Sequence, residues 1–144
     1  RYFTHHLDYE IERLKRLPAP LALLLLDIDD FKSFNERYGR SQADAMLKNI
    51  SHLLEGHIRS VDILCRYAAD EFVIILPGTD KTGTRMIAQK LRALIETARS
   101  FKAILSIGAA IHTPGMTRVD LVLSADRALS EAKKEGKNRI KVYG

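Results

Sequence analysis

Acidic residues occur in two short groups that could together hold a divalent cation. Asp27, Asp29 and Asp30 follow or end an aliphatic run, and Asp70 and Glu71 lie in a polar break between two apolar runs. Carboxylates held close together repel one another unless a cation lies among them, and oxygen ligands beside a phosphate suit Mg²⁺. The alternative is that these residues simply end strands and form turns, where acidic side chains are well solvated.

The chain is basic overall, with a formal net charge of +5 and a pI near 9.4. Such a charge suits nucleic acid, an anionic lipid or a phosphorylated small molecule. The basic residues are scattered apart from one cluster within residues 133–141, and no aromatic residue interleaves with that cluster. A single-stranded nucleic acid needs aromatic side chains for base stacking, so we expect no nucleic acid partner.

An aliphatic run positions the first acidic group. The run from Leu21 to Ile28 predicts a central strand that is buried on both faces. Residues 4–16 carry apolar side chains at helical spacing, and Pro18 and Pro20 follow them. This pattern predicts a short helix ahead of the strand.

The remaining apolar residues recur at spacings typical of helices and strands. They predict, in order, a polar loop after the first strand, a helix from residue 43 to about 57, strands at 63–67 and 72–76, a helix over 87–98, a strand over about 103–112, a helix over 121–132 and a strand at 139–143. The strands at 63–67 and 72–76 form a hairpin whose four-residue connection, 68–71, carries the second acidic group. Thr117 and Asp120 resemble a capping box for the last helix, and Gly136 resembles its C-cap.

This order is a helix, then a βαββαβ unit, then a further helix and strand. It predicts an α+β fold with a ferredoxin-like core, in which helices cover one face of a mainly antiparallel sheet. If the strands that carry the two acidic groups are neighbours, their carboxylates converge.

Length and composition fit one domain, residues 1–144. With 46% hydrophobic residues the chain can bury a core without disulfides, and the single cysteine, Cys65, excludes a disulfide framework. No apolar run approaches the roughly 18 residues that a membrane span needs, so we expect a cytoplasmic location. The first residue is not methionine, which suggests a piece of a longer signalling protein with an upstream sensor domain or a membrane anchor.

Several separate segments, taken together, resemble the GGDEF domain of diguanylate cyclases in order and spacing. They are Asp27-Ile28-Asp29-Asp30-Phe31-Lys32, Asn35, Tyr38-Gly39, Asp44, Arg66-Tyr67-Ala68-Ala69-Asp70-Glu71-Phe72, Leu76-Pro77-Gly78-Thr79, Ser106-Ile107-Gly108, Ala125-Asp126-Arg127-Ala128-Leu129, Ala132-Lys133 and Gly136-Lys137-Asn138-Arg139. The resemblance covers essentially the whole chain.

The resemblance implies a reaction between two GTP molecules held by two domains that meet face to face, giving cyclic di-GMP and pyrophosphate. It implies that Asp27 and Asp70 bind Mg²⁺, with the carbonyl of Ile28 as a further ligand. Glu71 matches the next carboxylate of the signature. An active protein of this kind is expected to be a homodimer.

The resemblance also implies residues that bind the nucleotide. Asn35 and Asp44 match the residues that read guanine, and a carboxylate can accept both Watson–Crick N–H donors of that base. Phe31 belongs to the same substrate site. Triphosphate contacts fall on the side chains of Lys32, Lys133 and Lys137. Each residue has a simpler role open to it: Asp44 could cap a helix, Asn35 could form a turn, and the two later lysines could favour a helix C-terminus.

Arg59 and Asp62 match the RxxD site at which the family binds its own product, cyclic di-GMP. Arg59 would fork onto a phosphate or a guanine edge, and Asp62 would accept from guanine. Lys90, in the following helix, is a further candidate for this site. The alternative is a surface ion pair between residues three apart at a helix end, which contributes little to stability.

The signature departs from the family pattern because Ala68 and Ala69 replace two glycines. A β-carbon at each position either strains a turn that needs positive φ or occupies space that the ligand needs. Arg40, Ala43 and Ser130 also differ from the usual histidine, glycine and tyrosine. The sequence therefore favours a cyclic di-GMP-binding module with weak or absent cyclase activity, and leaves open an active cyclase or a dimerisation module without a ligand.

Overall fold

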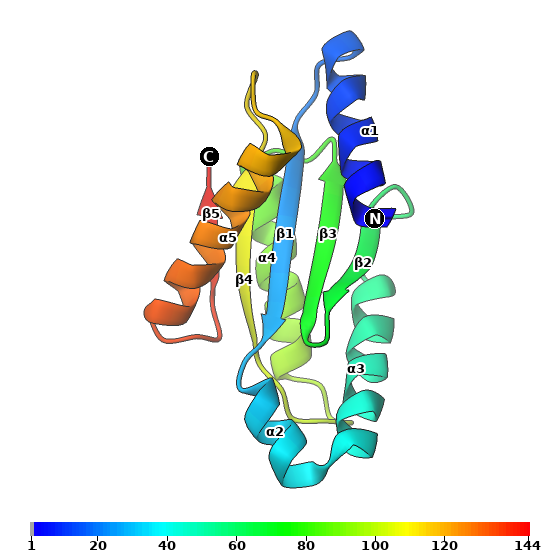
Figure 1. The fold of residues 1–144 in the computed structure, drawn as a ribbon, viewed down its shortest axis with the longest axis vertical. Helices are drawn as coiled ribbons and strands as arrows, with labels where there is room; N and C mark the ends of the chain where they lie inside the picture. The colour runs from blue at the N-terminus through cyan, green and yellow to red at the C-terminus, as the bar shows by residue number, and fades with distance from the viewer. Residues whose placement is uncertain (1) are drawn as a thin grey trace.

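The computed structural model describes residues 2–144 (Figure 1). Its helices are α1 (Tyr2–Arg16), α2 (Phe31–Tyr38), α3 (Arg40–Glu55), α4 (Lys81–Glu96) and α5 (Arg118–Lys134). Its strands are β1 (Leu21–Ile28), β2 (Ile63–Ala68), β3 (Glu71–Pro77), β4 (Leu105–Ile111) and β5 (Ile140–Tyr143).

The strands form one sheet in the order β2-β3-β1-β4-β5. The first four strands pair antiparallel, and β5 is parallel to β4. All eight residues of β1 are buried, as expected for an aliphatic strand at the centre of a sheet. The predicted α+β fold with a ferredoxin-like core is confirmed.

Helices cover both faces of the sheet, whereas the sequence led us to expect cover on one face. The even-numbered residues of β1, such as Leu24 and Leu26, pack with α2, α3 and α4, and the odd-numbered ones, such as Leu23 and Leu25, pack with α1 and α5. Figure 1 shows α1 and α5 in front of the sheet and α4 behind it. The core helices α3 and α4 do share one face, and the terminal helices bury the other.

Helix α5 lies unusually close to β4. A β-carbon at Gly108 would lie 2.1 Å from the amide nitrogen of Leu129, so only glycine permits this approach. At its N-terminus α5 has the predicted capping box of Thr117 and Asp120. At its C-terminus the amides of Gly136 and Lys137 bond to carbonyls of the last turn, with Gly136 at φ 129°, which is the Schellman motif.

Two local predictions were wrong. Residues 31–38 form helix α2 and not a polar loop; the helix is held because Phe31 is buried and Phe34 packs against the core. The hairpin connection is shorter than predicted, because β2 extends to Ala68 and β3 begins at Glu71. A register shift between Arg66 and Ala68 accommodates the longer strand.

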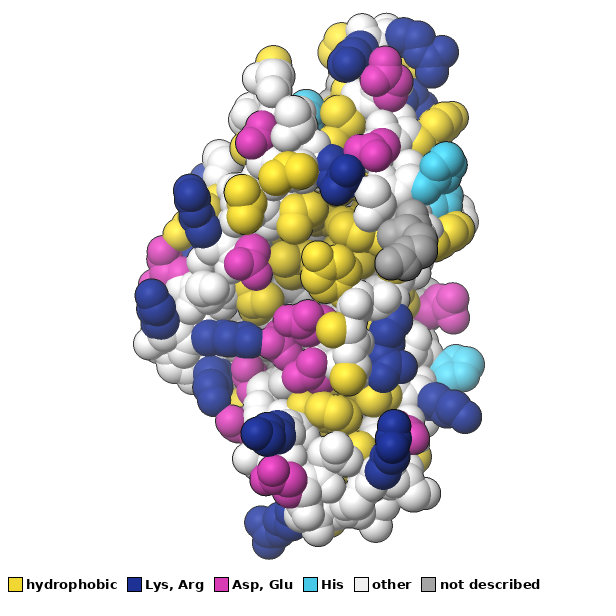
Figure 2. Space-filling view, viewed as in Figure 1, with side chains coloured by type: hydrophobic (Ala, Val, Ile, Leu, Met, Phe, Trp, Pro, Cys, Tyr) yellow, Lys and Arg dark blue, Asp and Glu magenta, His cyan; other side chains and the backbone are white. Residues whose placement is uncertain are grey.

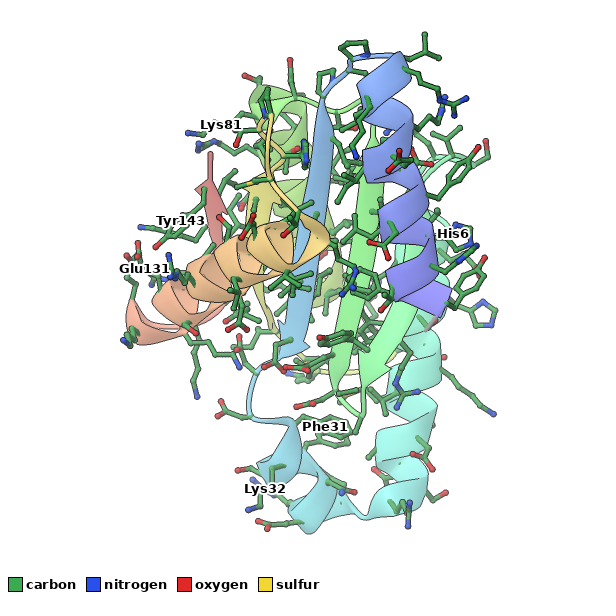
Figure 3. All side chains as sticks on the ribbon, turned by 45° about the horizontal axis from the view of Figure 1, so that its top comes forward. His6, Phe31, Lys32, Lys81, Glu131 and Tyr143 are labelled. Carbon is green, nitrogen blue, oxygen red and sulfur yellow. The ribbon has the colours of Figure 1, made fainter. Side chains whose placement is uncertain are left out.

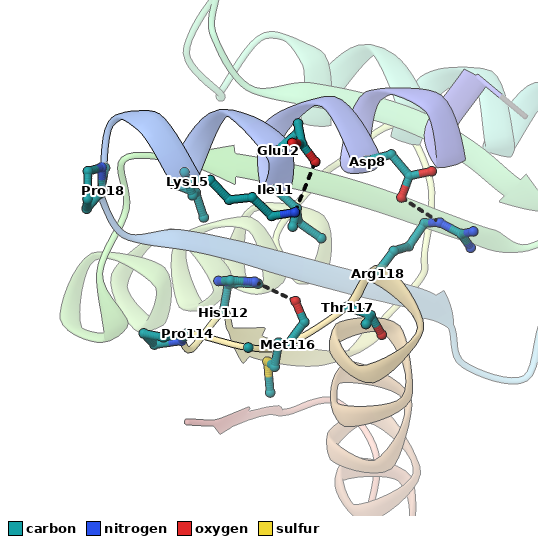
Figure 4. A pocket seen from close by; sticks show the side chains of 13 residues that line it. Asp8, Ile11, Glu12, Lys15, Pro18, His112, Pro114, Met116, Thr117 and Arg118 are labelled. Atoms are coloured by element: carbon teal, nitrogen blue, oxygen red, sulfur yellow. Dashed lines mark hydrogen bonds and ion pairs between the residues drawn. The ribbon is translucent and has the colours of Figure 1, made fainter.

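A cavity of about 740 Å³ lies between the C-terminal half of α1 and the loop that joins β4 to α5 (Figure 4). Its charged side chains are paired with one another: Asp8 with Arg118, and Glu12 with Lys15. None of the helices within residues 2–144 combines the length and the apolar character that a bilayer crossing requires.

Candidate functional site

The two acidic groups converge at the end of β1, because β1 and β3 are neighbours in the sheet. Asp27 lies opposite Glu71 in the β1–β3 register, and the amide of Ile28 donates to the carbonyl of Asp70 at 3.1 Å. Figure 2 shows acidic side chains gathered in the middle of this face, with lysine and arginine side chains on both sides. The hairpin therefore brings together carboxylates that are more than 40 positions apart in the sequence.

Asp27 is the most perturbed of these groups. Its side chain is 8% exposed, and burial raises the pKa of Asp27 from 3.8 to about 6, with Asp70 and Glu71 adding to the rise and Lys133 opposing it. Lys133 donates to Oδ2, while Oδ1 is buried and has no hydrogen-bond partner among the described residues. An unpartnered buried carboxylate oxygen beside two further carboxylates suits a cation.

The described side chains supply only part of the ligands that a metal ion needs. Within residues 2–144 no group of three or more His, Cys, Asp and Glu side chains is placed to hold a metal ion. Mg²⁺ commonly binds through one or two carboxylates and completes its shell with water and substrate phosphates. Asp27 and Asp70 therefore fit Mg²⁺ that arrives with a nucleotide, and do not form a cage of protein ligands.

Two lysines from the end of α5 reach the same region. Lys133 pairs with Asp27, and Lys137 donates to Asp30 at 2.8 Å. Burial alone would lower the pKa of Lys133, but its ion pair with Asp27 outweighs burial and raises it; the hydrogen bond to Asp30 raises the pKa of Lys137. Both cations therefore lie beside the acidic group, and their contact with a phosphate stays a prediction.

Asp29 is a structural residue. Its carboxylate accepts from the Ser106 hydroxyl at 2.7 Å and from the backbone amide of Asn138 at 3.0 Å, so it ties β1 to β4 and to the turn after α5. Sequence reasoning gave neither partner a role. The available signal was the turn pattern at residues 136–138, which places Asn138 at a positive φ of 48°.

The other residues assigned to nucleotide binding lie on α2 and α3, the two helices below the sheet in Figure 1. Asn35 and Lys32 are exposed on α2, and Asp44 is exposed on α3. Phe31 is buried, and Figure 3 shows it directed toward the hairpin, while Lys32 points away from the sheet. No contact joins Asn35 to Asp44 among the described residues, so their joint role in reading a base stays a prediction.

The hairpin tip carries no backbone strain at the alanines. In the described part of the chain, the non-glycine residues with positive φ are Asp30, Lys137 and Asn138. The expectation that Ala68 or Ala69 strains the turn is therefore wrong. That their β-carbons occupy space needed by a ligand stays a prediction. Sequence reasoning also gave no role to Arg66.

The guanidinium of Arg66 donates hydrogen bonds to the backbone of the hairpin tip. Its Nη2 donates to the carbonyl of Ala69 at 2.7 Å, and its Nε lies 3.2 Å from the carbonyls of both Ala68 and Ala69. The same guanidinium lies 6.0 Å from the centre of the Phe72 ring. One side chain thus holds both alanine carbonyls just before Asp70.

Arg59 and Asp62 form a bidentate ion pair in the loop between α3 and β2. Arg59 Nη2 lies 2.7 Å from Asp62 Oδ1, and it also donates to the Pro77 carbonyl and the Thr79 hydroxyl, both at 2.8 Å. The pair is not the surface pair at a helix end that we considered, because the side chain of Asp62 is 0% exposed and that of Arg59 is 48% exposed.

The Arg59–Asp62 pair borders a cavity of about 380 Å³. The hydrogen bond to Asp62 raises the pKa of Arg59. Lys90 is exposed on α4 and does not line this cavity.

Comparison with known proteins agrees with this geometry. Residues 1–139 match the family model described as "Diguanylate cyclase, GGDEF domain". The diguanylate cyclase DosC of Escherichia coli K12 is 33% identical over 141 residues, which cover 93% of this chain and 31% of DosC. The chain thus spans about a third of the length of the curated relatives it matches.

Two solved structures share the fold over nearly the whole chain. The active GGEEF domain of a Vibrio cholerae diguanylate cyclase has a TM-score of 0.92 at 26% identity, covering 98% of this chain and 94% of that domain. The diguanylate cyclase SiaD of Pseudomonas aeruginosa, solved with its activator SiaC, has a TM-score of 0.94 at 28% identity, covering 99% of this chain and 57% of SiaD.

Proposed function

Because this chain belongs to the GGDEF family, we propose that it is a binding module of cyclic di-GMP signalling with weak or absent cyclase activity. In this proposal cyclic di-GMP binds beside Arg59 and Asp62, and GTP with Mg²⁺ binds at the end of β1. The observation that carries the proposal is the half-exposed Arg59 guanidinium beside a cavity large enough to admit part of a dinucleotide.

Arg59 is suited to move from its internal partners to a phosphate. It makes hydrogen bonds to Asp62, Pro77 and Thr79, and roughly half of its side chain stays exposed. A guanidinium can fork onto two phosphate oxygens as it does onto a carboxylate. The side chain of Asp62 has no exposed surface, so it first acts by holding Arg59, and it can accept from a base only if the loop shifts.

The end of β1 supports GTP binding with Mg²⁺. Asp27 and Asp70 would hold the ion, which when bound would polarise the α-phosphate. Lys133 and Lys137 would offset the charge of the β- and γ-phosphates after leaving Asp27 and Asp30. Asn35 and Asp44 would read guanine from the two helices below.

Weak catalysis is inferred from the tip of the hairpin. The β-carbons of Ala68 and Ala69 stand where the family has none, and the Arg66 guanidinium holds their carbonyls in place. The tip therefore has little freedom to make room for an α-phosphate. A displacement of about 1 Å at the reacting centre can reduce a rate by on the order of a hundredfold.

The second candidate is an active diguanylate cyclase. It is favoured by the unpartnered Oδ1 of Asp27 and by the absence of positive φ at either alanine. Purified protein incubated with Mg²⁺ and GTP, followed by chromatography, separates the two. We expect GTP to remain unconverted. If the wild type forms cyclic di-GMP and the Asp27→Asn variant forms none, the protein is an active cyclase.

A further inference from the structure

The non-glycine residues with positive φ in the described part of the chain all lie in two adjoining turns. Asp30, at φ 57°, is in the turn between β1 and α2, and Lys137 and Asn138, at φ 64° and 48°, are in the turn between α5 and β5. Two hydrogen bonds join these turns: Lys137 Nζ donates to Asp30, and the backbone amide of Asn138 donates to Asp29. The left-handed conformations of non-glycine residues are therefore gathered beside the proposed GTP site.

Lys137 is the least suited of these residues to a positive φ. Aspartate and asparagine tolerate the left-handed region because their short polar side chains bond locally, whereas a lysine has no such compensation. Glycine would remove the strain at this position but would supply no charge. Backbone strain persists only where the surrounding structure enforces it, and it is found most often at functional sites. The strain at Lys137 therefore points to a role for its side chain.

The backbone of Lys137 is fixed, while its side chain is not. Its amide donates to the carbonyl of Ala132 at 3.1 Å, and its carbonyl accepts from Arg139 Nε at 3.1 Å. The side chain of Lys137 is 44% exposed, and that of its partner Asp30 is 63% exposed. An exposed ion pair contributes little to stability, so little is lost when this ammonium leaves Asp30.

The side chain of Asn138 holds the same turn against α4. Its Oδ1 accepts from Arg92 Nη1 at 2.9 Å, and its Nδ2 donates to Glu96 Oε2 at 2.7 Å. Arg92 also donates to Glu96 Oε1 at 2.8 Å, and the side chain of Arg92 is largely buried. Asn138 thus bonds to β1 through its backbone amide and to α4 through both polar atoms of its side chain. These bonds keep the turn in one conformation.

We propose that Asn138 is a positioning residue for the nucleotide site. It holds the turn after α5 in the left-handed conformation that places the Lys137 ammonium at the end of β1. Asn138 does not itself contact the nucleotide and acts through Lys137. Fixing the cation in advance reduces the conformational entropy that is lost when a triphosphate binds. This inference rests on the proposed GTP site, in which Lys137 offsets phosphate charge.

The test is a double-mutant cycle, measured by calorimetric titration with GTP in the presence of Mg²⁺. Lys137→Ala should weaken GTP binding about tenfold, because a hydrogen bond to a charged group is lost. Asn138→Ala should weaken it about fivefold when Lys137 is present, and should have no further effect in the Lys137→Ala protein. A residue that only stabilises the fold would have the same effect in both backgrounds.

Asn49→Ala is the matched control, because Asn49 is an exposed asparagine on α3 to which no role in binding is assigned. It should bind GTP with unchanged affinity. Circular dichroism verifies that each variant is folded. If Asn138→Ala is not folded, Asn138→Gly takes its place in the cycle, because glycine adopts a positive φ without strain and lacks the contacts to α4.

The outcomes separate this inference from the proposed function. If the wild type binds GTP, but the change at Asn138 has no effect or an equal effect in both backgrounds, the positioning role is wrong and the GTP site stands. Absence of saturable binding by the wild type at millimolar GTP contradicts the GTP site itself and overturns the inference with it.

Discussion

Asp27 and Asp29 are the same residue type two positions apart, and the fold gives them opposite roles. Asp29 has both oxygens bonded to Ser106 and Asn138, while Asp27 keeps one oxygen without a partner. The sequence identified both as candidate ligands and could not separate them, because the partners of Asp29 lie more than 70 positions away. Residue type indicates what a side chain can do, and its partners decide what it does.

The raised pKa of Asp27 predicts a pH dependence of stability. Because burial raises it from 3.8 to about 6, the folded protein binds a proton in this range that the unfolded chain has already released. The contribution of Asp27 to the free energy of unfolding therefore falls as pH rises from about 4 to 6. Urea unfolding of the wild type and of Asp27→Asn is measured between pH 4 and 6 in EDTA. The fall in the free energy of unfolding that Asp27 causes should appear only in the wild type. Equal slopes in the two proteins would argue against the raised pKa.

Because the side chain of Asp62 is buried, we expect Arg59→Ala to lower the stability of the protein as well as its affinity for cyclic di-GMP. A surface arginine could be replaced by alanine with little loss of stability. In the structure this change leaves the fully buried Asp62 carboxylate with only one donor, the backbone amide of residue 59. We expect Arg59→Ala to lower the free energy of unfolding by about 2–4 kcal/mol, measured by urea denaturation.

Arg59→Lys and Asp62→Asn are the controls for that prediction. In Arg59→Lys the positive charge beside Asp62 is kept, but the hydrogen bond to Thr79 is lost. Asp62→Asn removes the buried negative charge. Each variant should therefore lower the free energy of unfolding by less than Arg59→Ala does. An Arg59→Ala protein as stable as the wild type would mean that Asp62 is readily hydrated in solution.

At the scale of elements, strands with long aliphatic runs were predictable and short helices were not. The predicted bounds of the first strand, Leu21 and Ile28, are those of β1, because a strand buried on both faces leaves a continuous apolar run. Helix α2 was missed because its eight residues include few apolar ones and end at Tyr38, just before Gly39. Its stability comes from Phe31 and Phe34 packing on the core, which sequence periodicity over two turns cannot reveal.

The β2–β3 hairpin tests the reason for weak catalysis. Ala68→Gly with Ala69→Gly should raise cyclic di-GMP formation by at least about tenfold from a low or undetectable start, because two β-carbons leave the ligand space. Since neither alanine has positive φ, no relief of strain contributes. The assay is chromatography of products from Mg²⁺ and GTP at high protein concentration, because two domains must meet.

A second hairpin variant distinguishes the effect of the two β-carbons from the effect of a rigid hairpin tip. Arg66→Lys loosens the tip by removing the fork to the alanine carbonyls, while both β-carbons remain. Activity should rise most in the glycine variant and less in Arg66→Lys, because a looser tip regains only part of the room that the two β-carbons occupy. If the unmodified protein is already as active as the glycine variant, the steric explanation fails and the chain is a working cyclase.

At the scale of the whole molecule, the order of elements was enough to predict the topology. The βαββαβ order places the strand that carries Asp27 beside the strand that follows Asp70, and the structure has this pairing. The cover of the second face by α1 and α5 was not foreseen, because apolar spacing shows that a helix packs but not on which face of a sheet.

The measurement that tests the account most directly is a calorimetric titration of the unmodified protein with cyclic di-GMP. The account predicts saturable binding that Arg59→Lys weakens at least about tenfold, since lysine cannot fork onto a phosphate. Lys90→Ala, at an exposed position outside the cavity beside Arg59, should weaken binding less, and circular dichroism verifies that each variant is folded. No saturable heat with the wild type, or equal affinity in the folded Arg59→Lys protein, would contradict the claim that this domain binds cyclic di-GMP at Arg59 and Asp62.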